Sequence, residues 1–169
     1  CDTGDDYLGS KFHHGAPFRR GVEEGLIDPK RTIQIGIRGS LNDLDQWKFS
    51  HDCGMRVIYM EEFYELGVKA VIEEIRQISG DGPSYLTFDV DGLDPVYASG
   101  TGTPEVGGFS TVEAQLMIRG CQGLNLIGGD VVEVAPPFDP SGNTALTGAT
   151  MMFEILCVVA DAVASRRGG

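Results

Sequence analysis

Two aspartates stand two residues apart at the end of a hydrophobic run near the middle of the chain. The segment TFDVDGLDP spans residues 87–95 and places carboxylates at Asp89 and Asp91. Because side chains alternate across a strand, both are expected on one face of a strand over residues 85–91. Carboxylates this close repel one another and lose hydration, and a hard divalent cation is the usual compensation. The pair therefore predicts a metal site, and aspartates that cap a solvated strand end are the alternative.

Three further residues have side chains suited to the same kind of site. Asp2 lies just before a polar, glycine-containing loop over residues 4–14, His14 ends that loop, and Glu133 ends a hydrophobic run. A carboxylate can bind a cation, and a histidine can transfer a proton near neutral pH. Each residue alone also has an ordinary structural explanation, as part of a chain terminus, a polar group before a helix, or a solvated strand end.

Hydrophobic periodicity predicts an alternation of helices and strands. Helices are expected over residues 17–26, 42–51, 68–78, 110–119 and from 143 or 144 onward. Strands are expected over 32–37, 56–59, 85–91 and, as one or two strands interrupted at Gly128 and Gly129, within 124–134. Strands too apolar to have a wet face, alternating with helices, indicate an α/β fold with a mostly parallel sheet covered on both sides. Ligands bind beyond the carboxyl ends of such strands, where Asp89, Asp91 and Glu133 are expected.

Composition limits the class of protein further. The chain has 169 residues, 41% hydrophobic and 22% charged, as expected for one soluble globular domain. Its formal net charge of -12 argues against binding to nucleic acid or to an anionic membrane. The scattered cysteines are interpreted as reduced thiols, and no signal peptide is visible, so a cytoplasmic location is expected. The apolar stretch 144–164 contains Glu154 and Asp161 and is predicted to be a buried helix rather than a membrane span.

Several motifs together resemble the ureohydrolase family, the arginases and agmatinases. They are DVDGLDP at 89–95, GTGTPE at 100–105 and DVVE at 130–133, while HGAPFRR at 14–20 and TGATMM at 147–152 are most similar to the agmatinase and guanidinobutyrase branch. The resemblance implies a three-layer α/β/α fold and a centre of two divalent metal ions, usually Mn2+ with Ni2+ as an alternative. It also implies hydrolysis of a guanidino compound to urea and an amine by a homo-oligomer, a trimer or hexamer.

The resemblance also assigns roles to individual residues. It makes Asp89 the carboxylate that bridges both metals, Asp91 a ligand of the second metal, and Asp2 a ligand of the first. Asp2 corresponds to the last residue of the family's Asp-Ala-His-x-Asp motif. His14 matches the histidine of proton transfer, and Glu133 matches the carboxylate that holds the substrate guanidinium.

Part of the family pattern is absent from this sequence. Two histidines and one aspartate of the family's ligand set would precede Cys1, so residues 1–169 are interpreted as the C-terminal portion of a single catalytic domain. The expected substrate is a guanidino acid such as guanidinobutyrate, or agmatine, whose tail would contact the loops 4–12 and 100–108. The alternatives are a catalytically silent ureohydrolase-like subunit and a metal-dependent deacetylase of similar fold.

Overall fold

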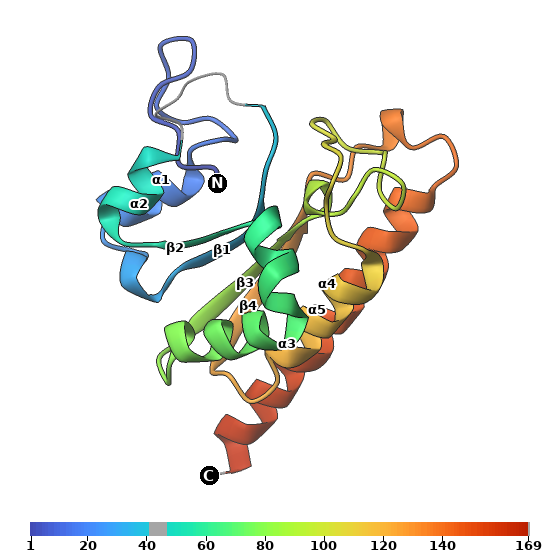
Figure 1. Cartoon of the computed structure of the whole chain (residues 1–169). Coiled ribbons are helices and arrows are strands. Elements are labelled where there is room, and N and C mark those ends of the chain that lie inside the picture. The colour runs from blue at the N-terminus through green and yellow to red at the C-terminus, as the bar shows by residue number, and fades with distance from the viewer. Residues whose placement is uncertain (41–46, 169) are drawn as a thin grey trace.

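The strands form parallel pairs. A computed structural model describes residues 1–40 and 47–168 of the chain (Figure 1). Within these ranges β1 (Ile33–Ile37) pairs in parallel with β2 (Arg56–Tyr59), and β3 (Ser84–Asp89) pairs in parallel with β4 (Leu126–Val132). Within the described residues no ladder of hydrogen bonds joins the two pairs. The predicted parallel α/β arrangement is therefore confirmed, as two separate two-stranded sheets.

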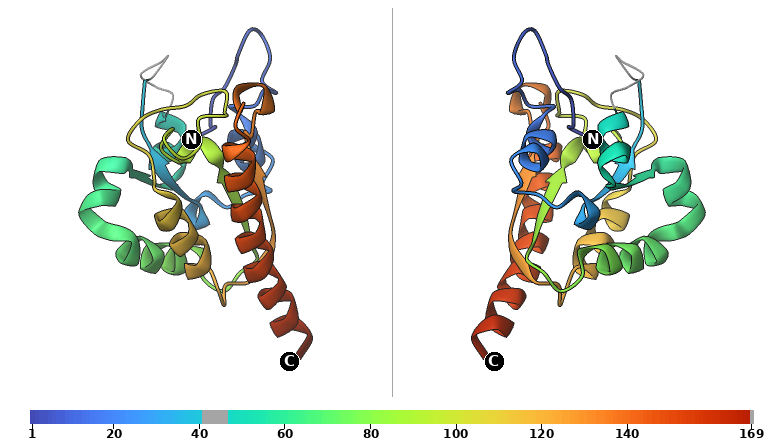
Figure 2. Two further views of the ribbon diagram at one scale, coloured as in Figure 1. Left: turned by 90° about the vertical axis from the view of Figure 1, so that its right-hand side faces the viewer. Right: turned by 90° about the vertical axis from the view of Figure 1, so that its left-hand side faces the viewer.

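Helices follow the strands in the predicted order. The α-helices are α1 (Pro17–Glu23), α2 (Lys48–Cys53), α3 (Met60–Ser79), α4 (Thr111–Gly120) and α5 (Asn143–Gly168), and the 3-10 helices are η1 (Pro29–Arg31), η2 (Val90–Gly92) and η3 (Pro136–Phe138). Helix α5 lies along β4 and also packs on α4, while α3 contacts β1, β2 and α4 (Figure 2). The carboxyl ends of β3 and β4 lie at the same end of the molecule as the loop over residues 100–108 (Figure 1).

A shared core joins α3, α4 and α5 to the strands. Phe63 of α3 is fully buried and meets Phe109 edge to face, with ring centroids 4.7 Å apart. Ile58 of β2, Val71 of α3 and Leu126 of β4 are also buried. Because hydrophobic burial is the main stabilising term, this core fixes the strands whose ends carry the candidate site residues.

Several element boundaries differ from those predicted. Helix α3 begins at Met60 instead of residue 68, with a kink at Gly67, where φ is 75°. Residues 124–134 hold one strand that runs through Gly128 and Gly129, because a side chain at Gly129 would meet Ile155 and the Leu86 carbonyl oxygen at 2.6 and 2.7 Å. The glycines thus let α5 and β3 approach β4 closely rather than ending it. Of the helix predicted over 42–51, residues 42–46 lie outside the described ranges.

Helix α5 buries only one face. Met151, Ile155 and Val158 recur at helical spacing and are buried, whereas Phe153 and Leu156 are 63% and 60% exposed. By length and composition the segment Asn143–Arg167 could span a membrane, and 33% of its most apolar window is buried in the described chain. The prediction of a buried helix thus holds for the face on β4 and α4, and is wrong for the opposite face.

Candidate functional site

Asp89 and Asp91 lie in adjoining elements rather than on one strand. Asp89 is the last residue of β3, and Asp91 lies in the 3-10 turn η2. The Asp89 carboxylate accepts a hydrogen bond from the Asp91 backbone N–H at 3.0 Å, an interaction that caps this turn. The strand predicted over residues 85–91 therefore ends at Asp89, where the turn begins. Because a 3-10 turn does not alternate faces, the turn and not strand pleating sets the relative orientation of the two carboxylates.

The Asp89 carboxylate is strongly perturbed by its surroundings. Burial, together with the negative charge of Asp91, raises the pKa of Asp89 to about 8. Asp91 in turn accepts a hydrogen bond from the Thr103 hydroxyl at 2.8 Å, from the glycine-rich loop over residues 100–108. A half-buried pair of neighbouring carboxylates is an arrangement that a divalent cation would stabilise.

Asp2 approaches this pair from the loop that begins the chain. Its backbone oxygen accepts a hydrogen bond from the Phe18 N–H of α1 at 3.3 Å. Although the side chain is exposed on one side, the surrounding protein raises the pKa of Asp2, chiefly by desolvation and also through the charges of Asp91 and Glu133, while His14 opposes the rise. The Asp2 carboxylate therefore lies within electrostatic range of Asp91, Glu133 and His14.

Glu133 follows β4 in an unusual backbone conformation. Its φ is 64°, in the left-handed region that residues with a Cβ rarely adopt. Its carboxylate is exposed and has no hydrogen-bond partner in the described chain, and its Oε2 lies 3.8 Å from where a Cβ on Gly102 would stand. Backbone strain of this kind persists where the surrounding structure enforces it, and it is concentrated at functional sites. The turn directs an unpaired carboxylate toward the loop 100–108.

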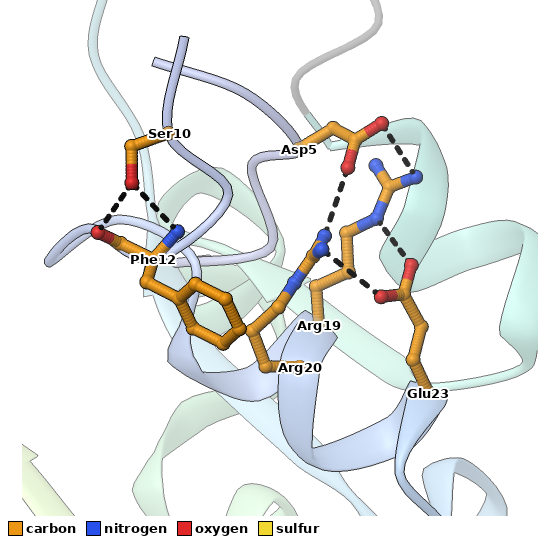
Figure 3. A network of polar contacts seen from close by, with 6 residues as sticks. All are labelled: Asp5, Ser10, Phe12, Arg19, Arg20 and Glu23. Atoms are coloured by element: carbon orange, nitrogen blue, oxygen red, sulfur yellow. Dashed lines mark hydrogen bonds and ion pairs between the residues drawn. The ribbon is translucent and has the colours of Figure 1, made fainter. Parts of the chain in front are cut away.

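The loop that carries His14 is held in place by its own contacts. Gly4 N–H donates to the Gly15 oxygen at 2.8 Å and closes the loop, and Asp5 forms ion pairs with Arg19 at 3.2 Å and Arg20 at 2.9 Å (Figure 3). Glu23 of α1 binds the same two arginines from the other side. The loop is thereby anchored to α1, and the exposed imidazole of His14 lies at its end.

The neighbouring histidine has a different environment. His13 is half-buried, and its Nε2 is a buried nitrogen without a hydrogen-bond partner in the described chain. Its ring centroid lies 6.4 Å from that of His14. The exposed imidazole of His14 is therefore better placed than that of His13 to exchange a proton with a bound molecule.

The five predicted site residues lie near the carboxyl ends of β3 and β4, but they do not complete a metal centre. In the part of the chain that the structure describes, no group of three or more His, Cys, Asp or Glu side chains lies close enough together to hold a metal ion. The donor set of Asp2, Asp89 and Asp91 fits a divalent cation by its charge and oxygen chemistry, and further ligands would be needed.

Two contributions to the site were not predicted from sequence. Thr103 binds the Asp91 carboxylate, and Arg38 donates to the Asp91 backbone oxygen at 2.8 Å. The glycine-rich loop that contains Thr103 was expected only to recognise a substrate tail. Arg38 directly follows β1, whose carboxyl end lies at the same end of the fold, and that position is the signal from which its role could have been inferred.

Comparisons with known proteins match nearly the whole chain. The sequence profile described as "Arginase family" matches residues 1–158. The chain is 58% identical over 164 residues to a protein of Pseudomonas aeruginosa named guanidinopropionase, covering 96% of this chain and 52% of that protein. It is 54% identical over 158 residues to a Gallus gallus protein named mitochondrial agmatinase, covering 94% of this chain and 46% of that one. Among solved structures, the proclavaminate amidino hydrolase of Streptomyces clavuligerus superposes with a TM-score of 0.91 at 40% identity, over 95% of this chain and 54% of that chain. The chain thus spans about half the length of these relatives.

Proposed function

Because this chain belongs to the arginase family, we propose that it is part of an enzyme that hydrolyses a small guanidino compound to urea and an amine. The observation that carries the proposal is the position of Asp89 and Asp91, linked through the turn that follows β3, and of the unpaired carboxylate of Glu133, which directly follows β4. We also propose that residues 1–169 form the C-terminal portion of one catalytic domain, since the relatives are about twice as long.

The acidic cluster would hold two divalent metal ions, Mn2+ or Ni2+. Asp2, Asp89 and Asp91 would help to hold these ions, with the remaining ligands supplied from outside the described residues. Bound metal supplies this reaction with Lewis acidity and with water of lowered pKa. The elevated pKa of Asp89, about 8, means that this carboxylate must release a proton before it binds a cation at neutral pH. The Thr103 hydroxyl and the Asp91 N–H limit the orientations that the carboxylates of Asp91 and Asp89 can take.

Glu133 and His14 would act on the substrate itself. A planar guanidinium can donate two parallel hydrogen bonds to one carboxylate, so Glu133 would fix the orientation of the carbon that is attacked. Its exposed carboxylate is available for this because no described residue competes for it. The amine leaves only after it gains a proton, and His14, at the end of the anchored loop, is the side chain proposed to deliver it.

The substrate is proposed to be a guanidino acid such as guanidinobutyrate or guanidinopropionate, with agmatine as the alternative. The relative named guanidinopropionase is 58% identical and the relative named agmatinase is 54% identical, so both tails deserve a direct test. A carboxylate tail and an ammonium tail carry opposite charges, and the loops 4–12 and 100–108 are the segments proposed to discriminate between them. The protein is also proposed to be cytoplasmic and to form a homo-oligomer.

The test is urea release by the complete protein loaded with Mn2+. The panel contains 3-guanidinopropionate, 4-guanidinobutyrate, agmatine and arginine, with an acetyl-lysine peptide to test for deacetylation. Urea from at least one guanidino compound, lost in the Glu133→Gln variant while metal content is kept, supports the proposal. Release of acetate without urea would favour a deacetylase, and tight metal binding without any turnover would favour a silent subunit.

A further inference from the structure

Arg38 connects three segments around the candidate site through hydrogen bonds to backbone oxygens. Its Nη1 donates to Gly36 at 3.1 Å, within β1. Its Nη2 donates to Asp91 at 2.8 Å and to Leu93 at 3.2 Å, in and just after the turn η2. The same nitrogen donates to Glu105 at 2.5 Å, and Nε donates to Val106 at 3.2 Å, both in the loop 100–108. One half-buried guanidinium thus joins β1, the aspartate turn and the glycine-rich loop.

The segments that Arg38 joins are those whose spacing determines the shape of the site. The turn η2 carries Asp91, and the loop 100–108 carries Thr103, which binds the Asp91 carboxylate. The loop also brings Gly102 beside the Glu133 carboxylate. The space at Arg38 is closely filled, because a Cβ on Gly108 would lie 2.6 Å from the Arg38 Nη2. A displacement of the guanidinium would therefore move the loop relative to both carboxylates.

We infer that Arg38 is a positioning residue, which holds the loop 100–108 at a fixed distance from the Asp89–Asp91 turn. The inference rests on the proposed function for its effect on turnover. Arginine suits this task because its planar guanidinium presents donors in several fixed directions, whereas a lysine ammonium is a single point of donation on a flexible stem. Within the described residues Arg38 forms no ion pair, so its contacts serve backbone oxygens rather than a carboxylate partner.

Arg31 provides a matched control at the opposite end of the same strand. It precedes β1, is also half-buried, and also donates to backbone oxygens: to Ser79 at 3.0 and 2.6 Å and to Pro83 at 3.3 Å. These contacts lie before β3 begins, away from the candidate site. Replacement of Arg31 by lysine therefore removes similar hydrogen bonds without touching the aspartate turn or the loop 100–108.

The experiment compares Arg38→Lys with Arg31→Lys in the complete, Mn2+-loaded protein. For Arg38→Lys we expect kcat/KM on the best guanidino substrate to fall about 10- to 100-fold, as expected when reacting groups are misplaced by about 1 Å. Metal content should be unchanged, and amide hydrogen exchange should become faster in residues 100–108. Arg31→Lys should keep the wild-type kcat, KM and exchange rates in that loop. Arg38→Gln, whose planar amide can still donate to one segment, serves if the lysine variant does not fold.

Wild-type kinetics and loop exchange in Arg38→Lys would overturn the inference. An equal loss of kcat/KM in Arg31→Lys would also overturn it, because the effect would then reflect general destabilisation. If the wild-type protein released no urea from any guanidino compound, the proposed function would fail. The exchange of residues 100–108 in Arg38→Lys against Arg31→Lys would still decide whether Arg38 positions the loop.

Discussion

Two replacements of Glu133 should differ in stability while both abolish activity. Its φ of 64° places a residue with a Cβ in the left-handed region. We compare Glu133→Ala with Glu133→Gly in the complete protein. Both variants remove the carboxylate and its repulsion of Asp2, so these effects cancel in the comparison. What remains is the backbone, because glycine adopts positive φ without strain and alanine does not.

The magnitude follows from two opposing terms. A residue with a Cβ in the left-handed conformation costs about 1–2 kcal/mol, which glycine avoids. Glycine also makes the unfolded chain more flexible, which costs about 0.5–1 kcal/mol relative to alanine. The net expectation is that Glu133→Gly is more stable than Glu133→Ala by roughly 0–1.5 kcal/mol, taking the difference of the two terms. Both variants should lose nearly all turnover, since neither can hold the guanidinium.

Denaturant unfolding measures the stability difference, and urea release measures turnover. Glu24 is the matched control: it is an exposed glutamate at the end of α1 with φ of -85°. There the glycine variant should be less stable than the alanine variant, by about 0.5–1 kcal/mol. If glycine were also clearly the less stable replacement at position 133, the strain would not exist. If Glu133→Gly kept substantial turnover, the proposed guanidinium contact would be wrong.

Four further outcomes are expected. Asp89→Asn should abolish activity and strip bound metal, because a neutral amide cannot bridge two cations, and elemental analysis that found two tightly held metals would contradict this role. His14→Ala should slow turnover by roughly 10²–10⁴-fold with metals retained and with partial rescue by imidazole, whereas His13→Ala should have a smaller effect. In metal-free protein the pKa of Asp89 is about 8, above its value in the unfolded chain. The stability that Asp89 contributes should therefore decline as pH rises from ~4 through ~8. Denaturant unfolding in EDTA measures this dependence of stability on pH, which should disappear in Asp89→Asn. Residues 1–169 expressed alone should be inactive and should bind two metals poorly, and a fully active product would refute both the ligand assignment and the interpretation as a C-terminal portion.

The sequence predicted the elements whose signals are local. The helix predicted over 110–119 starts with a capping box, in which Ser110 Oγ accepts from the Glu113 N–H at 3.2 Å and Glu113 Oε2 accepts from the Ser110 N–H at 2.7 Å. The strand over 56–59 was predicted with its observed bounds. The start of α3 was missed, and the predicted interruption of β4 at Gly128 and Gly129 was wrong. Glycine inside β4 is a local weakness that the close approach of α5 and β3 overrides.

The site was predicted by residue type, and its geometry was not. Regular alternation would place Asp89 and Asp91 on one strand, but the Asp89 carboxylate caps the turn that holds Asp91. That capping interaction competes with strand continuation, as aspartate side chains commonly do. The position of Arg38 directly after β1 indicates the end of the fold where it lies, but its individual contacts, from Asp91 to Val106, are with residues far along the chain and no local pattern specifies them.

Two unfavourable features of this fold lie where the catalytic role is proposed. At the opposite end of β1, Arg31 and the carbonyl oxygens around it satisfy one another. At the carboxyl ends of β3 and β4, by contrast, Asp89 is held at a pKa of about 8 beside another carboxylate. Glu133 is held there in a left-handed conformation, without a hydrogen-bond partner in the described chain. A protein selected for stability alone would lose both features through single substitutions. A divalent cation would relieve the first and a guanidinium the second, and the chemistry of a guanidino hydrolase requires both.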